Sequence, residues 1–382
     1  MLLHYFDHFA QDHRAYKGGA WCYEDGLVYQ GLIALYEATG ETGFLDHAVR
    51  MARLQVSAEG QIKGYKLTDF NIDNIQPGRA ILKLFELTND PRFKVAADTL
   101  ITQLKQHPRT KAGNYWHKKR YPWQVWLDGL NMGITFQIQY GIASQNDALV
   151  DDALAQLAGA ITLTRVPETG LYAHAYDEAR EQPWADPVTG HNAAHWARAI
   201  GWMAMALIDA CEMVGLERAQ DAGILAPTRA LMDQLVAVQT SGRLWLQVID
   251  QPNLCGNYEE TSASAMFALS MMAAQRIGVT QNTKVGAAGR AAFVELVERM
   301  IDPDRAAQGR GFGQMVWVAG LGTFDGRFRD GSAKYYTLED IVEDDPKGVG
   351  PLMRAAAEFL QQGGVLPVVG ERYTRLPTKA YG

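Results

Sequence analysis

The chain has few cysteines, no long apolar run and no basic leader segment. Its three cysteines, Cys22, Cys211 and Cys255, lie far apart along 382 residues, so they fit neither a disulfide framework nor a zinc-binding spacing. No stretch of about 18 apolar residues occurs, and a membrane-spanning helix is therefore not expected. The first residues lack the basic and apolar segments of a signal peptide. These absences predict a cytoplasmic protein with no membrane partner.

Basic residues are in the minority. The chain has 36 lysines and arginines against 43 aspartates and glutamates, which gives a net charge of -7. Proteins that bind nucleic acid need clustered basic residues, so a nucleic-acid partner is not expected. An anionic ligand would have to meet a local group of cations.

Motifs for common cofactors are missing as well. The glycine-rich segments 309–313 and 320–326 lack the dinucleotide-binding pattern, and no phosphate-binding loop occurs. A serine nucleophile elbow is absent too. His191 and His195 stand four residues apart, as in a zinc-binding helix, but the glutamate of that motif and an obvious third ligand are missing. We therefore interpret both as hydrogen-bonding residues and predict neither a cofactor nor a metal.

Helical periodicity runs through most of the sequence. In 196–214 apolar residues recur every three or four positions, which places them on one face of an α-helix. Similar spacing predicts further helices over 24–39, 42–56, 75–89, 91–106, 128–143, 146–163, 222–240, 260–277 and 284–300, with a weaker pair that ends near 351–361. Taken in order, these segments form about six helix pairs.

A second repeat separates the helix pairs. A glycine followed by a short segment with aromatic or β-branched residues recurs at Gly60, Gly113, Gly170, Gly242 and Gly311. A period of about 50 to 70 residues indicates one structural unit used repeatedly. We therefore predict an all-α protein in which residues 1–382 form a single (α/α)6 barrel with short β excursions. An open α-solenoid of the same helix pairs is the alternative.

Polar motifs recur near the start of the first helix of each pair. They lie at 23–26, 71–74, 126–129, 195–198 and 257–260. In a closed barrel these helix starts face the same end, where a shared cleft would form the ligand site.

Asp73 and Asp128 are the candidate acid–base residues, because they occupy equivalent positions in neighbouring repeats. An aspartate at a helix start more commonly caps the helix or faces its dipole. Asp128, however, has Tyr121, Trp123 and Trp126 close by in the sequence. An aromatic surround and a second carboxylate favour the protonated acid that a proton donor requires.

Two histidines and a basic run add to this site. His117 and Lys118 precede Asp128 in a stretch that would otherwise be a solvated surface, and His174 follows the Gly170 segment. An isolated histidine is more often structural than functional. The cations near Asp128 make a role in binding a carboxylate plausible.

Arg198 lies between Trp196 and Trp202 on a helix with an apolar face. A guanidinium in such a place must be paired or must meet an anion of the ligand. Trp202 is one turn further along the same face, and its ring serves either as a platform for a sugar or as part of the core.

Five motifs resemble, in their order, those of the unsaturated rhamnogalacturonyl hydrolases, glycoside hydrolases of families 105 and 88. They are Trp-Leu-Asp-Gly-Leu at 126–130, His-Ala-Tyr-Asp-Glu at 174–178, Trp-Ala-Asp-Pro-Val-Thr-Gly at 184–190, Trp-Ala-Arg-Ala-Ile-Gly-Trp at 196–202 and Glu-Thr-Ser-Ala-Ser-Ala-Met-Phe at 260–267. The resemblance covers nearly the whole chain. It implies an (α/α)6 barrel, in agreement with the helix pairs.

The resemblance also implies the reaction. In this family a polysaccharide lyase has left a C4=C5 double bond in the terminal uronic acid. An aspartic acid protonates C4, positive charge develops at C5 and the ring oxygen, and water adds at C5. The hemiketal then opens and the remaining sugar leaves. The implied substrate is a pectin-derived oligosaccharide that ends in an anionic unsaturated uronate, above all the unsaturated rhamnogalacturonan disaccharide.

By motif, the resemblance makes Asp128 the proton donor and water activator, and Asp73 the carboxylate that orients the substrate. It implies that His174 lies near the sugar ring. The other implied substrate-binding residues are Tyr23, His117, Lys118, Trp126, Arg198 and Trp202.

Two positions depart from the family pattern and bear on the leaving sugar. Asn131 stands where many members have tyrosine, and His195 stands where phenylalanine often precedes the tryptophan. Three alternatives remain. They are an unsaturated glucuronyl hydrolase acting on glycosaminoglycan fragments, a sugar epimerase that uses His117 and His174, and a helical-repeat scaffold without activity.

Overall fold

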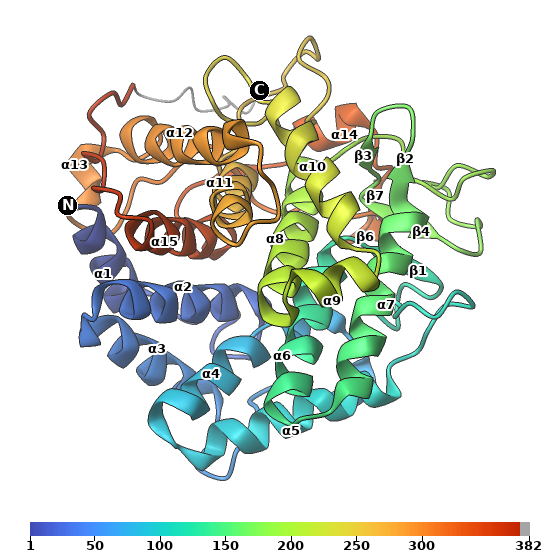
Figure 1. Cartoon of the computed structure of the whole chain (residues 1–382), viewed down its shortest axis with the longest axis horizontal. Coiled ribbons are helices and arrows are strands. Elements are labelled where there is room, and N and C mark those ends of the chain that lie inside the picture. The colour runs from blue at the N-terminus through green and yellow to red at the C-terminus, as the bar shows by residue number, and fades with distance from the viewer. Residues whose placement is uncertain (375–382) are drawn as a thin grey trace.

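A ring of apolar helices forms the inside of the molecule (Figure 1). The computed structural model describes residues 1–374, so the end of the predicted domain 1–382 lies outside the described residues. Within 1–374 the ring consists of α2 (Tyr23–Thr39), α4 (Gly78–Thr88), α6 (Thr135–Ala143), α8 (Ala197–Val214), α11 (Thr261–Arg276) and α15 (Pro346–Gln361). Each helix contacts the next, and α15 lies beside α2. The ring is thus closed, which confirms the barrel over the open solenoid.

A second layer of helices covers the ring from outside. It includes α3 (Thr42–Gln55), α5 (Pro91–Gln106), α7 (Asp147–Thr164), α10 (Leu225–Ala237) and α12 (Thr283–Arg299), each packed on the inner helix before it. Outer helices bury one stripe, as α3 does with Phe44, Ala48 and Met51. The inner helix α8 is buried on nearly all sides, because it has neighbours both in the ring and outside it.

The predicted helix ranges agree with the observed ones to within a few residues, except at two starts. The range 75–89 begins as a short 3-10 helix, η2 (Ile72–Ile75), and the regular helix α4 starts only after Pro77. The range 128–143 begins as a π-helix, η3 (Leu130–Ile134). Asp73 lies within η2, and Asp128 comes two residues before η3. Helical turns of the π type are frequent at functional sites.

The prediction of a weak helix pair at the C-terminal end is wrong. Only α15 is a long helix there among the described residues, and the outer layer is completed by the unpredicted α1 (Leu2–Asp12). Helix α1 packs against α3 and α13 (Pro303–Ala306) and buries Leu2, Tyr5 and Phe6. The repeat therefore begins with an outer helix, so the two ends of the chain complete the barrel together. Two further short helices, α9 (Leu216–Asp221) and α14 (Ala333–Leu338), were also not predicted.

The predicted β excursions exist, but most are shorter than strands. The Gly170 and Gly311 segments lead into β3 and β5, and other segments form isolated bridges such as Val56 with Ile62. The strands pair as β1 (Gln124–Trp126) with β4 (Ala175–Asp177), β2 (Arg165–Val166) with β3 (Leu171–Tyr172), β5 (Met315–Val316) with β8 (Ile341–Val342), and β6 (Gly322–Phe324) with β7 (Arg327–Arg329). All four pairs are antiparallel.

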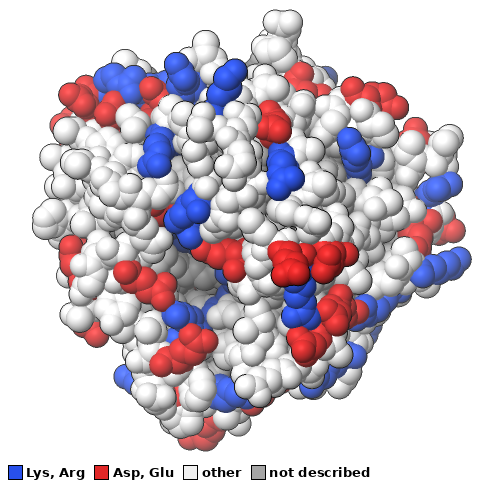
Figure 2. Space-filling view, viewed as in Figure 1, with Lys and Arg blue, Asp and Glu red and all other residues white. Residues whose placement is uncertain are grey.

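The surface carries both signs of charge. Figure 2 shows basic and acidic side chains intermingled over one face of the molecule. Within residues 1–374 no helix has the length and apolar character needed to cross a membrane.

Candidate active site

Asp73 forms the first polar centre, at the start of η2. The Asn71 side chain accepts a hydrogen bond from the Asp73 backbone N–H at 3.1 Å and so fixes this turn. Oδ2 of Asp73 forms an ion pair with Lys118 Nζ, and Oδ1 lies 3.5 Å from His117 Nε2. A backbone bridge between Asn71 and Lys118 brings the two segments together. The sequence placed His117 and Lys118 near Asp128, and the structure joins both residues to Asp73.

Burial and charge set the protonation of this centre. Burial raises the pKa of Asp73, but the charges of Lys118 and His117 outweigh burial and lower the pKa overall. Burial lowers the pKa of His117 to about 4, although Asp73 acts in the opposite direction. Near neutral pH the centre thus holds an ionised Asp73, paired with Lys118, and a neutral His117.

Asp128 forms the second polar centre, in the turn between β1 and η3. The register of β1 on β4 sets Trp126 opposite Ala175, and this places Asp128 next to His174. Nε2 of His174 lies 3.1 Å from Oδ2 of Asp128. The His174 ring is completely buried, so its position is fixed by packing.

His174 is held from behind by two residues that the sequence did not point to. Its Nδ1 lies 2.8 Å from the Tyr336 hydroxyl, and the Asn192 side-chain amide donates to the same hydroxyl at 3.4 Å. Because the amide N–H can only donate, the hydroxyl proton is free to go to Nδ1 of His174. This network assigns the remaining ring proton to Nε2, on the side of Asp128.

Aromatic rings join the two centres. Trp126 is stacked with His117 at 4.6 Å and with Tyr121 at 4.9 Å between ring centroids, and it meets His174 edge-on at 5.1 Å. Trp123 does not join this stack, contrary to expectation. It is 36% exposed and packs on Trp116 instead, because its left-handed backbone, with φ of 63°, precedes β1.

Arg198 is paired by the protein itself. Its guanidinium donates to Ser262 Oγ at 2.7 Å and to the carbonyl oxygens of Trp317 and Val316. Glu260, which caps α11, lies 3.6 Å away. Arg198 is therefore paired within the protein, which is the first of the two roles expected for it. It connects α8 to α11 and β5.

Trp202 and Tyr23 meet beside this junction. Trp202 is 1% exposed, and its ring stands edge-on to the partly buried Tyr23 at 6.4 Å. Burial raises the pKa of Tyr23, with further contributions from Glu24 and Asp73. Trp202 is thus part of the core, and Tyr23 packs against that core from outside.

Arg329, on β7, is a further residue that the sequence did not indicate. Arg198, Arg329 and Lys347 are the basic residues less than a tenth exposed within 1–374. The first and last have a carboxylate at 3.6 Å and 2.7 Å, whereas Arg329 has none within 4.0 Å among the described residues. It contacts Tyr121 Oη and two carbonyl oxygens, each at 3.4 Å. A buried guanidinium normally has a counter-ion.

His191 and His195 make separate local hydrogen bonds. His191 Nε2 lies 2.7 Å from the Leu163 carbonyl oxygen. His195 contacts the Tyr172 carbonyl oxygen at 2.9 Å and Thr169 Oγ1 at 3.0 Å. Nowhere in the described part of the chain do three or more His, Cys, Asp or Glu side chains gather in a way that could hold a metal ion.

Comparisons with known proteins point to the glycoside hydrolases of families 88 and 105. Residues 4–362 match the model of Glycosyl Hydrolase Family 88. A solved family 105 glycoside hydrolase from C. acetobutylicum is 33% identical, with a TM-score of 0.84 over 90% of this chain and 94% of that one.

Curated relatives match as well. A protein of Agrobacterium fabrum is 47% identical over 60% of this chain and 98% of its own length. The unsaturated rhamnogalacturonyl hydrolase YesR of Bacillus subtilis is 26% identical over 73% of this chain and 77% of its own length. The chain therefore belongs to the glycoside hydrolases of families 88 and 105, and it is an unsaturated uronyl hydrolase.

Proposed function

We propose that the chain releases an unsaturated uronic acid from the unsaturated rhamnogalacturonan disaccharide, with Asp128 as the proton donor. The observation that carries the proposal is the pair of Asp128 and His174, 3.1 Å apart and backed by a buried hydrogen-bond network. The similarity to YesR, which is named as an unsaturated rhamnogalacturonyl hydrolase, supports this substrate. Family membership leaves the epimerase and the inactive scaffold without support.

In the proposed reaction the carboxylic acid of Asp128 gives its proton to C4 of the enol ether. The ionised Asp73, held by Lys118, stabilises the positive charge that develops at C5 and the ring oxygen. Water adds at C5 and returns a proton to the Asp128 carboxylate. The hemiketal then opens and the leaving sugar departs. One proton and one water are thus accounted for, and no further reactant is needed.

The substrate carboxylate needs a cation in a protein of net charge -7. Lys118 is bound to Asp73, and Arg198 and Lys347 each have a carboxylate partner. Arg329 has none among the described residues and contacts Tyr121, which stacks on Trp126. We assign the uronate carboxylate to Arg329 because pairing would supply its missing counter-ion.

The test is an activity assay on defined unsaturated disaccharides. Loss of the ultraviolet absorbance of the conjugated double bond should accompany release of rhamnose, and reaction in deuterium oxide should leave deuterium at C4. Esterifying the uronate carboxylate should lower kcat/KM. Asp128→Asn should lower kcat by about 10²- to 10⁴-fold, because removal of a general acid costs that much, with an unchanged melting temperature.

Three results would count against the proposal. Wild-type protein that consumes no unsaturated uronide would remove it entirely. A strong preference for a glycosaminoglycan disaccharide over the rhamnose-containing one would replace its substrate. Full activity of Asp128→Asn would remove the proton donor.

A further inference from the structure

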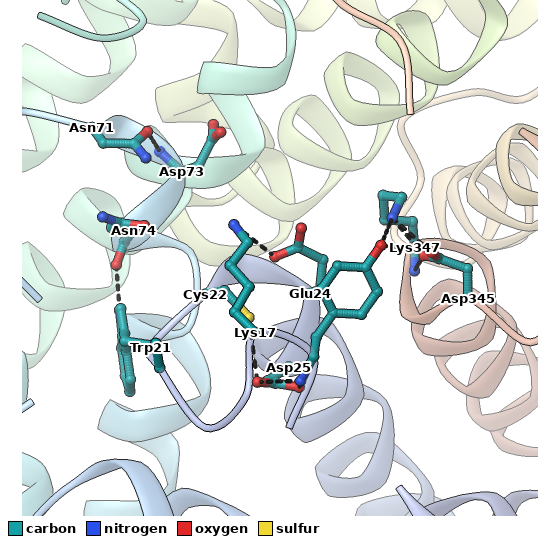
Figure 3. A network of polar contacts seen from close by, with 12 residues as sticks. Lys17, Trp21, Cys22, Glu24, Asp25, Asn71, Asp73, Asn74, Asp345 and Lys347 are labelled. Carbon is teal, nitrogen blue, oxygen red and sulfur yellow. Dashed lines mark hydrogen bonds and ion pairs between the residues drawn. The ribbon is translucent and has the colours of Figure 1, made fainter. Parts of the chain in front are cut away.

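A row of charged side chains runs from Asp73 toward α15, and the proposed reaction uses only its first member. Figure 3 shows the row passing from Asp73 through Lys17 and Glu24 to Lys347. Lys347 is nearly fully buried, forms an ion pair with Asp345 at 2.7 Å and donates to the Tyr16 hydroxyl at 3.1 Å. Lys347 and Asp345 thus neutralise each other's charge, whereas Glu24 has fewer polar partners.

Glu24 is buried but incompletely bonded. It lies in the first turn of α2, is 5% exposed, and its Oε2 makes no hydrogen bond to any residue within 1–374. Lys17 is its ion-pair partner among the described residues, with Nζ 3.6 Å from Oε2. Burying a carboxylate oxygen without a donor costs free energy. An acidic side chain near the start of a helix interacts favourably with the helix dipole even when it is exposed, so the dipole does not explain why Glu24 is buried.

The neighbouring Asp25, in the same turn, has the full set of hydrogen bonds expected of a structural carboxylate. Asp25 accepts hydrogen bonds from the Gln55 side chain at 2.7 Å and from the Tyr16 backbone at 3.0 Å, and His13 lies 2.8 Å away. Every contact of Asp25 is thus supplied by the protein. The contrast indicates that Glu24 receives its missing donors from outside the protein.

Lys17 connects Glu24 to the active site. Its side chain is 51% exposed, so the ammonium group can reach a bound ligand. The charge of Lys17 also helps to lower the pKa of Asp73. Burial raises the pKa of Glu24, and the charges of Lys17 and Lys347 oppose this rise. A ligand that extends from Asp73 in this direction would meet Lys17 first and then Glu24 (Figure 3).

We infer that Glu24 and Lys17 form the binding site for the leaving sugar. Glu24 accepts hydrogen bonds from two neighbouring hydroxyls of that sugar, and Lys17 donates to a third oxygen. Hydroxyl donors to a carboxylate form short, strong hydrogen bonds, and they would satisfy the buried oxygen. The buried negative charge repels sulfate or carboxylate groups, so the site selects a neutral leaving sugar. This inference rests on the proposed function, which places the unsaturated uronate between Asp73 and Asp128.

The experiment compares two substrates that share the unsaturated uronate. One carries a neutral sugar as leaving group, and the other carries phenol, which offers no hydroxyl to Glu24. The measured quantity is the ratio of kcat/KM for the sugar substrate to that for the phenyl substrate. Glu24→Gln should lower this ratio about ten- to a hundredfold, because a charge-assisted hydrogen bond is lost. Lys17→Met, which changes only a half-exposed side chain, should lower it several-fold (~3-fold).

Asp147→Asn is the matched control. Asp147 is also an acidic residue in the first turn of a helix, α7, but its side chain is 83% exposed. Asp147→Asn removes an exposed first-turn charge and its surface ion pair with Arg218, and it should leave the ratio unchanged. An unchanged ratio in both Glu24→Gln and Lys17→Met would overturn the inference. Equal losses on both substrates with a lower melting temperature would also overturn it, since they indicate a structural role.

The two proposals fail in different ways. Wild-type protein that acts on neither substrate contradicts the proposed function and, with it, this inference. Wild-type protein that acts on both, combined with unchanged ratios in the variants, leaves the proposed function intact and overturns the leaving-sugar site alone.

Discussion

At the scale of single residues, Tyr336 positions the candidate active site although it belongs to none of the motifs recognised in the sequence. Its hydroxyl sits between Asn192 and His174, and burial raises its pKa, so it remains a neutral phenol. A neutral phenol can give its proton to Nδ1 of His174 and thereby fix the tautomer that faces Asp128. Tyr336 is thus a positioning residue that acts through His174.

Replacing Tyr336 with phenylalanine tests this role. Without the hydroxyl, Nδ1 of His174 loses its donor and the other tautomer becomes accessible. We expect kcat to fall by roughly tenfold, with KM little changed and an altered pH profile, because an interaction needed mainly in the transition state is weakened. Tyr335→Phe is the control, since Tyr335 Oη instead accepts from the Gly320 backbone. Matching pH profiles for Tyr336→Phe and wild type would refute the assignment.

Lys118 gives a second test, through pH. The pKa of Asp73 is lowered overall because Lys118 and His117 outweigh burial. The ionised Asp73 therefore adds stability and activity above its usual pKa, and both are lost as pH falls through the lowered value. Lys118→Met should move this acid limb of kcat/KM upward by about one pH unit. The neighbouring Lys119→Met should not move the limb, because no ion pair joins Lys119 to Asp73 among the described residues. An unmoved limb in Lys118→Met would contradict the ion pair's role.

The sequence predicted part of this site. Asp73, His117 and Lys118 meet, as do Asp128 and His174, because their motifs begin neighbouring repeats or lead into them. Tyr336 and Arg329 could not be found in this way. They come from the irregular segment before α15, where no repeat fixes the spacing. Glu24 lies in the polar motif at 23–26, but only the structure shows that its Oε2 is buried without a hydrogen bond among the described residues.

At the scale of elements, close contact between α2 and α15 depends on glycine. A Cβ on Gly350 would lie 2.6 Å from the Leu27 carbonyl oxygen of α2, and a Cβ on Gly31 would lie 2.7 Å from Met353 Cβ. Backbone atoms cannot move aside as a flexible side chain can. The two helices at opposite ends of the sequence therefore close the ring only with small residues at the crossing.

Gly350→Ala should consequently destabilise the protein. Overpacking of a tight contact costs about 1–3 kcal/mol, more than the gain in helix propensity. The control is Gly43→Ala in the first turn of α3, where the added Cβ would meet no atom of another described segment within 4 Å. This control should be neutral or gain up to about 1 kcal/mol. Thermal unfolding measures both, and equal melting temperatures for the two variants would disprove the close contact.

Helices were predicted correctly where apolar residues recur with helical spacing. They were missed where contacts with other segments of the chain determine the structure. The range 91–106 was exact for α5, because this outer helix has one buried stripe and a proline at its start. Helix α1 was missed because its role depends on α3 and α13, which contact it from other repeats. The late start of α4 depends on Pro77, which follows η2.

At the scale of the whole molecule, one carboxylate holds together helices from both ends of the chain. Asp209 on α8 forms ion pairs with Arg79 on α4 and, at 2.7 Å, with Arg354 on α15. Both arginines line a cavity of about 320 Å³ that also includes Glu37 and Lys83. Burial raises the pKa of Asp209, but Arg354 and Arg79 outweigh it and lower the pKa overall.

Asp209→Asn should therefore weaken the closed barrel without touching the chemistry. It would leave two largely buried guanidinium groups without their shared carboxylate, and loss of one partner from a buried ion pair costs about 3–5 kcal/mol. Because the folded-state pKa of Asp209 is lowered, its stabilisation is present at neutral pH and is lost as pH falls through that pKa. The melting temperature of wild type and variant should thus differ most at neutral pH and converge in acid.

The cavity supplies a control for this prediction. Glu37 pairs with Lys83 at 3.1 Å, but its side chain is 41% exposed, so Glu37→Gln should cost no more than about 1 kcal/mol. Below the unfolding transition, kcat of Asp209→Asn should equal that of wild type, because neither arginine contacts Asp73 or Asp128. If the melting temperatures of Asp209→Asn and wild type instead differ by the same amount at every pH, the ionised carboxylate is not what joins α4, α8 and α15.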